Sequence, residues 1–217
     1  MKIKWNGHAS FTITAADGTV LVTDPYDPSG YDGVLKYDQV SDRADAVLVS
    51  HDHADHNYVK GLSGSPKVLK SSGQVKGIQI KGIDTYHDES DGSERGANKV
   101  FSFTVDGINI CFMGDLGHQL SSEQIKAIDS VDLLLIPVGG TYTLDAEGAT
   151  KVVEALGAKL VIPMHFKTDK CDLPIAKVDG FLARMTNVKE LNVSEVDLSR
   201  DKLPSDGHEV WVLNYGC

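Results

Sequence analysis

Short runs of apolar and β-branched residues recur along the chain and predict β-strands. Two of them, Ser10 to Thr14 and Thr19 to Thr23, flank an Asp17-Gly18 pair, which predicts an antiparallel hairpin at the start of the chain. The remaining runs of this kind predict strands at Ala46–Val49, Ile78–Ile83, Ile108–Met113, Leu133–Val138, Lys159–Ile162 and His208–Tyr215. Strands are therefore expected over the whole length of the chain.

Helical patterns fall between several of these strands. The run Ser121-Ser122-Glu123-Gln124 can cap a short helix that continues to about Asp129. Asp145 can cap a second helix that stops at Gly157, and a third is predicted from Pro174 to about Met185. No stretch resembles a linker and no sequence repeat is present, so we expect one α/β domain spanning residues 1–217 with some antiparallel strand pairing.

Composition is that of an ordinary globular protein, with 41% hydrophobic and 24% charged residues. The apolar runs have the length of strands and are too short for a signal peptide core or a membrane span, so a cytoplasmic location is the default expectation. Cys111, Cys171 and Cys217 are widely spaced and odd in number. Neither a disulfide framework nor a thiolate metal site is indicated.

The formal net charge of −10 indicates which kinds of partner the protein can bind. A negative protein opposes the release of counterions that drives most binding to nucleic acids, so no nucleic acid partner is expected. A small-molecule substrate is expected instead, because metal ions bound at one site can offset the negative charge locally. The oligomeric state is left open, with a homo-oligomer as one outcome.

Residues that can bind metals stand where the predicted strands stop. His51 follows Val47-Leu48-Val49-Ser50, and His87, Asp115 and His165 follow three later strands in the same way. In open α/β sheets, functional residues gather outside the carboxyl ends of the strands. Four such endings can converge on one edge of a sheet.

The densest group of these residues is the run His51-Asp52-His53-Ala54-Asp55-His56. His51 and His53 can point the same way in extended backbone, whereas Asp55 and His56 come at the first turn of a short helix predicted over Asn57–Leu62. The alternative is a solvated loop, but three of only eight histidines lie in this window. Imidazole and carboxylate ligands indicate zinc, iron or manganese.

This run resembles the HxHxDH signature of the metallo-β-lactamase superfamily, and Asp24, His87, Asp115 and His165 follow the order of that superfamily's other motifs. Trp5-Asn6-Gly7-His8-Ala9-Ser10-Phe11, Asp24-Pro25, Arg95-Gly96-Ala97-Asn98 and Pro163-Met164-His165 resemble the branch that contains ascorbate-6-phosphate lactonase and N-acyl phosphatidylethanolamine phospholipase D. The resemblance implies a four-layer αββα sandwich with two divalent metal ions at one edge, Zn²⁺ first, with Mn²⁺ or Fe²⁺ as alternatives.

The resemblance also implies a role for each ligand. His51, His53 and His87 would hold the first ion, Asp55, His56 and His165 the second, and Asp115 would bridge both. His118, in Gly114-Asp115-Leu116-Gly117-His118, competes with His87, but the spacing from His87 to Asp115 favours His87.

Two such ions point to a binuclear metal-dependent hydrolase whose nucleophile is a hydroxide that bridges the metals. Asp55 can orient that hydroxide, and the site should attract a small anionic ester, lactone or phosphodiester. His8 and Asp24 are candidates for orienting the ligands. His118 and Tyr142, after Gly139-Gly140, are candidates for substrate contacts, and Arg95 for an anionic group, although an ion pair with Glu94 is its commoner use.

Three other functions fit parts of the pattern. A metal-dependent nuclease on the same fold should carry a basic strip, whereas the lysines here are scattered. A diiron enzyme that reduces oxygen usually has Glu where this chain has His53, together with a flavin module. A non-enzymatic metal-binding module is disfavoured by the complete ligand set. The sequence names neither the physiological substrate nor the native metal.

Overall fold

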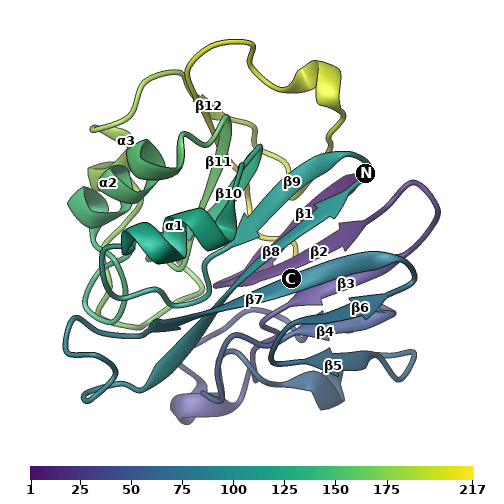
Figure 1. Cartoon of the computed structure of the whole chain (residues 1–217). Helices are drawn as coiled ribbons and strands as arrows, with labels where there is room; N and C mark the ends of the chain where they lie inside the picture. The colour runs from purple at the N-terminus through teal and green to yellow at the C-terminus, as the bar shows by residue number, and fades with distance from the viewer.

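A computed structural model describes residues 1–217 as two β-sheets stacked face to face, with three α-helices grouped on one side (Figure 1). The six-stranded sheet has the order β13-β1-β2-β3-β4-β5. Its strands are β1 (Lys2–Gly7), β2 (Ser10–Thr14), β3 (Val20–Thr23), β4 (Ala46–Leu48), β5 (Lys67–Leu69) and β13 (Glu195–Asp197). Strands β1, β2, β3 and β13 pair antiparallel, whereas β3, β4 and β5 are parallel.

The eight-stranded sheet has the order β12-β14-β11-β10-β9-β8-β7-β6. Its strands are β6 (Gly73–Val75), β7 (Ile78–Tyr86), β8 (Ala97–Val105), β9 (Ile108–Phe112), β10 (Leu133–Pro137), β11 (Leu160–Met164), β12 (Val188–Glu190) and β14 (Glu209–Val212). The half from β9 to β12 is parallel and the half from β6 to β9 antiparallel. The parallel half brings the carboxyl ends of β9, β10 and β11 to one edge.

The main core lies between the sheets. Side chains of successive strand residues point to opposite faces, so Ala46 and Leu48 of β4 join the main core while Val47 and Val49 join a second cluster on the outer face. Tyr26 and Tyr37, from the segment between β3 and β4, cover that outer face. This segment contains the 3₁₀ turn η1 (Gly30–Gly33) and no α-helix, because its prolines and glycines disfavour one.

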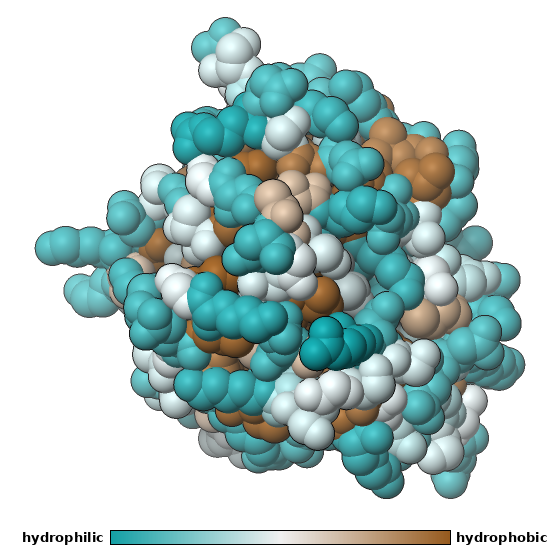
Figure 2. All heavy atoms as spheres, turned by 90° about the vertical axis from the view of Figure 1, so that its right-hand side faces the viewer, coloured by the Kyte–Doolittle hydropathy of each residue, from teal (hydrophilic) through white to brown (hydrophobic).

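The α-helices are α1 (Ser122–Ile128), α2 (Ala146–Leu156) and α3 (Asp179–Leu182), and two further 3₁₀ turns are η2 (Val59–Gly61) and η3 (Arg200–Lys202). Helix α1 contacts β7, and α2 contacts β10 and α3. The αββα sandwich is therefore confirmed, with an irregular segment as the outer layer of the six-stranded sheet. No helix is long and apolar enough to span a membrane, and on the face in Figure 2 brown apolar residues form only small groups among polar ones.

The first two helices begin where the sequence predicts. Ser121 and Gln124 form a reciprocal capping box at α1, and α2 ends at Gly157 with a left-handed φ of 58°. The third helix is shorter than predicted, because the backbone of Ala176 bonds to Gly139 and Lys167 instead of forming a helical turn. The helix predicted after His56 is only the 3₁₀ turn η2.

The cap of α2 gives a test of this local structure. The Asp145 side chain accepts a hydrogen bond from the Gly148 amide at 2.7 Å. Asp145→Ala is therefore expected to lower the free energy of unfolding by about 1 kcal/mol. The control is Glu147→Ala in the same first turn, which breaks only exposed pairs with Lys151 and Arg184 and should cost about 0.5 kcal/mol or less. Chemical denaturation of both variants measures the difference, and equal losses would contradict the capping role.

Candidate metal centre

The Asp115 carboxylate lies at the centre of a cluster of histidines. Asp115 follows β9, and its Oδ2 is 3.0 Å from His56 Nε2, 3.1 Å from His87 Nε2 and 3.3 Å from His165 Nε2. The Nε2 atom of His51 lies slightly farther away, at 3.9 Å. The predicted convergence of these strand ends on one edge is therefore what the structure shows.

The ligand-type atoms around Asp115 form three groups, each with members within 4.8 Å of one another. The group of Asp24, His51 and His56 overlaps the other two, which share no residue. One group contains His51, His53 and His87. The other contains Asp55, His56 and His165 together with His8. These are the two sets expected from the sequence, with His8 added to the second.

Hydrogen bonds orient three of the imidazoles so that Nε2 faces the centre. His56 Nδ1 donates to Asp24 Oδ2 at 2.8 Å, and His87 Nδ1 donates to the Tyr142 carbonyl at 2.9 Å. His51 Nδ1 lies 2.8 Å from the Ser50 hydroxyl, which itself donates to Asp24. Such partners fix the tautomer and the ring orientation of metal-binding histidines. Asp24 therefore has the orienting position expected from the sequence.

Two buried carboxylate oxygens in the cluster, Asp55 Oδ1 and Asp115 Oδ1, have no hydrogen-bond partner. An unpaired buried polar atom costs free energy, and more so when it carries charge. A divalent cation would satisfy both oxygens, and imidazole and carboxylate ligands are those that zinc, manganese and iron accept. The residues present therefore fit the metal ions that the sequence implies.

The electrostatics of the cluster follow from its burial. Burial, together with the neighbouring His56, lowers the pKa of His51 to about 2, so its imidazole is neutral at pH 7. Burial opposes charge on His56 as well, but Asp115 and Asp55 outweigh burial and raise the pKa of His56. A proton on His56 thus offsets the two carboxylates in the metal-free protein, in the place where a metal cation would do so.

Left-handed backbone occurs at three residues of the cluster. His8 and His165 have φ of 51°, and Asp24 has φ of 31°. This conformation is uncommon for residues other than glycine and costs on the order of 1–3 kcal/mol at each position unless the surroundings enforce it. It marks the cluster as a place where the fold holds side chains in set directions.

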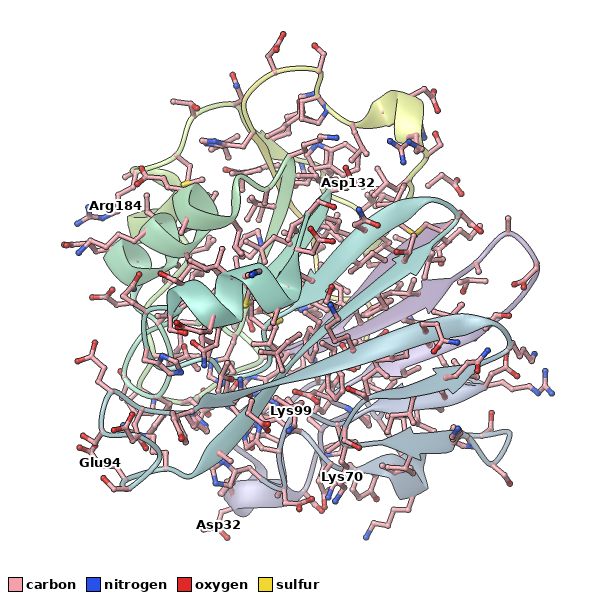
Figure 3. The ribbon with its side chains drawn as sticks, viewed as in Figure 1. Asp32, Lys70, Glu94, Lys99, Asp132 and Arg184 are labelled. Carbon is pink, nitrogen blue, oxygen red and sulfur yellow. The ribbon has the colours of Figure 1, made fainter.

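A pocket of about 350 Å³ opens over the cluster. Its floor includes His53, Asp55 and Asp115, and Tyr31, Arg95, Tyr142 and Leu173 contribute to its walls. Arg95 is its only Lys or Arg, and the guanidinium carbon lies 5.9 Å from the centre of the Tyr142 ring. Figure 3 shows Glu94, next to Arg95, at the same end of the molecule as Asp32 of η1. A second, more polar hollow of about 360 Å³ shares Glu94, Arg95 and Tyr142 with this pocket.

Comparison with known proteins agrees with this geometry. Residues 2–165 match the model of a beta-lactamase superfamily domain, which is most of the chain. The chain belongs to the metallo-β-lactamase superfamily.

Similar proteins span nearly the same length. A Thermotoga maritima member of the metallo-β-lactamase superfamily is 35% identical, with a TM-score of 0.80 over 98% of this chain and 97% of its own. A "UPF0173 metal-dependent hydrolase" of Nitratidesulfovibrio vulgaris is 30% identical over 77% of this chain and 80% of its own length. One of that description from Thermoplasma acidophilum is 28% identical over 77% of this chain and 84% of its own.

Tyr142 and His118, the two residues expected to contact the substrate, lie in different places. Tyr142 lines the pocket. His118 does not, because its Nε2 accepts from the Tyr86 amide at 3.1 Å and its Nδ1 donates to the Gln119 carbonyl at 2.8 Å. Both ring nitrogens are thus occupied by backbone groups outside the cluster. The structure therefore does not place His118 where a substrate contact was expected, nor where it could replace His87 as a ligand.

Sequence reasoning missed Tyr31 and Ser50. Tyr31 is 49% exposed on η1 and reaches the pocket from a segment without a periodic pattern, so no signal pointed to it. Ser50 had a signal, since it directly precedes His51.

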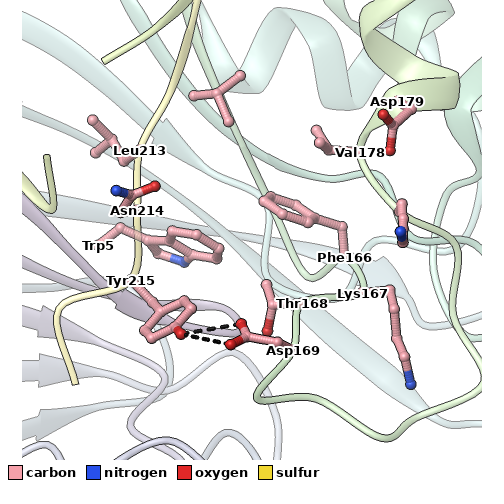
Figure 4. Close-up of a pocket in the computed structure, with 12 residues that line it drawn as sticks. Trp5, Phe166, Lys167, Thr168, Asp169, Val178, Asp179, Leu213, Asn214 and Tyr215 are labelled. Carbon is pink, nitrogen blue, oxygen red and sulfur yellow. Dashed lines mark hydrogen bonds between the residues drawn. The ribbon is translucent and has the colours of Figure 1, made fainter. Parts of the chain in front are cut away.

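A larger pocket, of about 470 Å³, lies elsewhere and contains none of these ligand-type residues (Figure 4). Its lining includes Trp5, Phe166 and Tyr215, whose hydroxyl donates to Asp169. The chemistry of this metallo-β-lactamase fold is therefore expected at the smaller pocket, where titratable groups and unpaired oxygens converge.

Proposed function

We propose that this chain is a binuclear metal-dependent hydrolase that acts on a small anionic ester, lactone or phosphodiester. The observation that carries the proposal is the position of Asp115 Oδ2, within 3.3 Å of the Nε2 atoms of His56 and His165 from one ligand group and of His87 from the other. The relatives from N. vulgaris and T. acidophilum are described as metal-dependent hydrolases, which supports the same reaction class.

Each ion has its own residues in this proposal. His51, His53 and His87 would hold the first, Asp55, His56 and His165 would hold the second, and Asp115 would contact both. When bound, two divalent ions lower the pKa of water to about 7 and polarise the electrophile. Zn²⁺ is the first choice for histidine-rich ligands, with Mn²⁺ and Fe²⁺ as alternatives. Asp55 lines the pocket and can orient the attacking water there, and Tyr142 can contact the substrate.

The charge of the pocket supports an anionic substrate. Two divalent ions would bring four positive charges against the two carboxylates of Asp55 and Asp115. Arg95 places a guanidinium in the wall of the pocket, where it pairs with Glu94 at 3.4 Å, so the positive charge would come mainly from the ions. The surrounding protein carries a net charge of −10, which repels long polyanions more than a small anion that reaches the ions. The pocket volume of about 350 Å³ also suits a small molecule.

Metal content provides the first test. Purified protein reconstituted with Zn²⁺ is expected to carry close to two ions per chain, because seven ligands exceed what one tetrahedral ion accepts. Elemental analysis after removal of free metal measures the ratio. Only trace metal after reconstitution would refute the proposal.

Substrate class is tested by Arg95. In a panel of phosphodiesters, sugar-phosphate lactones, β-lactams and single-stranded nucleic acid, assayed with zinc and with manganese, we expect turnover of the small anions. Arg95→Ala should raise the KM for the best anionic substrate by about 10- to 100-fold, the effect of losing a charged hydrogen bond. Arg184→Ala, which breaks only a surface pair with Glu147, is the control and should leave KM unchanged. Turnover confined to nucleic acid would favour the nuclease alternative, and no turnover would favour a metal-binding module.

A further inference from the structure

His8 lies at the corner between β1 and β2, fully buried behind the metal cluster. Its Nε2 is 3.0 Å from Asp55 Oδ2, and its ring packs on His165 with 4.0 Å between the ring centres. Unlike Asp55 and His165, His8 does not line the pocket over the cluster. It therefore cannot contact a substrate there, and it reaches the site only through the residues in front of it.

The two oxygens of Asp55 have different surroundings. Oδ2 accepts the hydrogen bond from His8 Nε2 and also lies 3.5 Å from His56 Nε2, whereas Oδ1 is buried without any partner. A carboxylate held at one oxygen has its other oxygen directed by that bond, in the way that outer hydrogen bonds orient metal ligands. The His8 bond thus holds the Asp55 carboxylate beside His56, with one of its oxygens unpaired.

The backbone at His8 is built to hold this direction. The His8 carbonyl accepts hydrogen bonds from the Trp5 indole and from the His165 amide, both at 3.0 Å. Trp5, visible in Figure 4, forms part of the wall of the 470 Å³ pocket. Gly7 precedes with φ of 124°, and a Cβ atom there would lie 2.8 Å from the Tyr37 ring. These contacts enforce the left-handed φ of 51° at His8.

We propose that His8 is a positioning residue for the second ion: its Nε2–H bonds to Asp55 Oδ2 and so fixes the orientation in which the Asp55 carboxylate would bind that ion. The inference rests on the two-ion site proposed above. In this proposal the other residues of the cluster bind an ion directly, whereas His8 only orients the ligand Asp55.

The test compares His8→Gln with His8→Leu by titrating the metal-free protein with Co²⁺ and following its visible absorption. A Gln amide nitrogen reaches about as far as His Nε2 and can donate to Asp55, whereas Leu fills similar space and cannot. Both side chains have a Cβ and no β-branch, so the left-handed φ at this position has a similar energetic cost for each. In His8→Leu we expect the affinity for the second equivalent to fall about 10- to 100-fold, with the first equivalent unchanged. His8→Gln should stay within about 3-fold of the native protein, well inside that range.

Folding is checked by circular dichroism before titration. If His8→Leu does not fold, His8→Asn replaces it, because its amide is too short to reach Asp55 and the same weakening of the second equivalent is expected. The inference is overturned if both equivalents weaken together, if neither weakens, or if His8→Gln is as weak as the variant without the donor. A native protein that binds only one equivalent would refute the two-ion proposal itself, and the role of His8 with it.

Discussion

Asp115→Ala is expected to remove both ions from the protein and to lower kcat/KM by about 10⁴-fold or more, the rate equivalent of several kcal/mol of lost stabilisation. The reason is the position of its Oδ2 among the Nε2 atoms of His56, His87 and His165, which belong to both ligand groups. Elemental analysis and steady-state kinetics on the variant measure the two effects.

The matched control is His165→Ala. His165 belongs to the second ligand group alone, so this variant should retain about one ion per chain. Asp115→Asn keeps the shape of the side chain and removes its charge, and it should resemble Asp115→Ala if the charge is what holds the ions. Loss of a single ion from both Asp115→Ala and His165→Ala would contradict the bridging role.

Gly117→Ala is expected to destabilise the protein strongly although it leaves every ligand in place. A Cβ at Gly117 would lie 2.4 Å from the amide nitrogen of Asp88 and 2.4 Å from the carbonyl carbon of His87. Backbone atoms cannot move aside as a flexible side chain can, so we expect a loss of about 3 kcal/mol or more. For a chain of this size that corresponds to a fall in Tm of about 6–12 °C.

The same substitution should weaken the first ion, because relief of the clash displaces His87. Gly180→Ala in α3 is the control, since its Cβ would meet only Ala146 at 3.6 Å, an ordinary contact. Its Tm should change little. Thermal unfolding and metal titration of both variants test the expectation, and equal Tm values would show that the turn at Gly117 yields more readily than its contacts indicate.

The edge of the sheet that carries the site could be predicted because strand ends are visible in the sequence. His51, His87, Asp115 and His165 each follow an apolar run, and parallel strands bring their ends together. His118 shows where the same reasoning fails. It lies three residues after Asp115, but the chain turns at Gly117, whose amide bonds to the Tyr86 carbonyl, and this turn points the His118 ring at the Tyr86 backbone.

Elements with unusual burial were harder to predict. Strand β8 was missed because it begins with Ala97-Asn98, and asparagine is typical of turns. In the structure Asn98 is buried, and its side chain donates to Thr85 and Met113 and accepts from the Asp115 amide. The function of His8 was similarly open in the sequence, because a buried histidine in a strand pattern has no visible partner until Asp55 is placed beside it.

The pairing of β1 with β13 bears on how the chain reaches this structure. The Lys2 side chain donates a hydrogen bond to the Glu195 carboxylate although the two residues lie 193 positions apart, and the N-terminal ammonium donates to the Leu198 carbonyl. During synthesis, β1 therefore waits for almost the whole chain before its outer edge is covered. Contacts of such long sequence separation slow folding, and an open strand edge can pair with other molecules meanwhile. A chain that ends before Glu195 would lack both β13 and β14, one strand from each sheet, so its yield of correctly folded protein should fall.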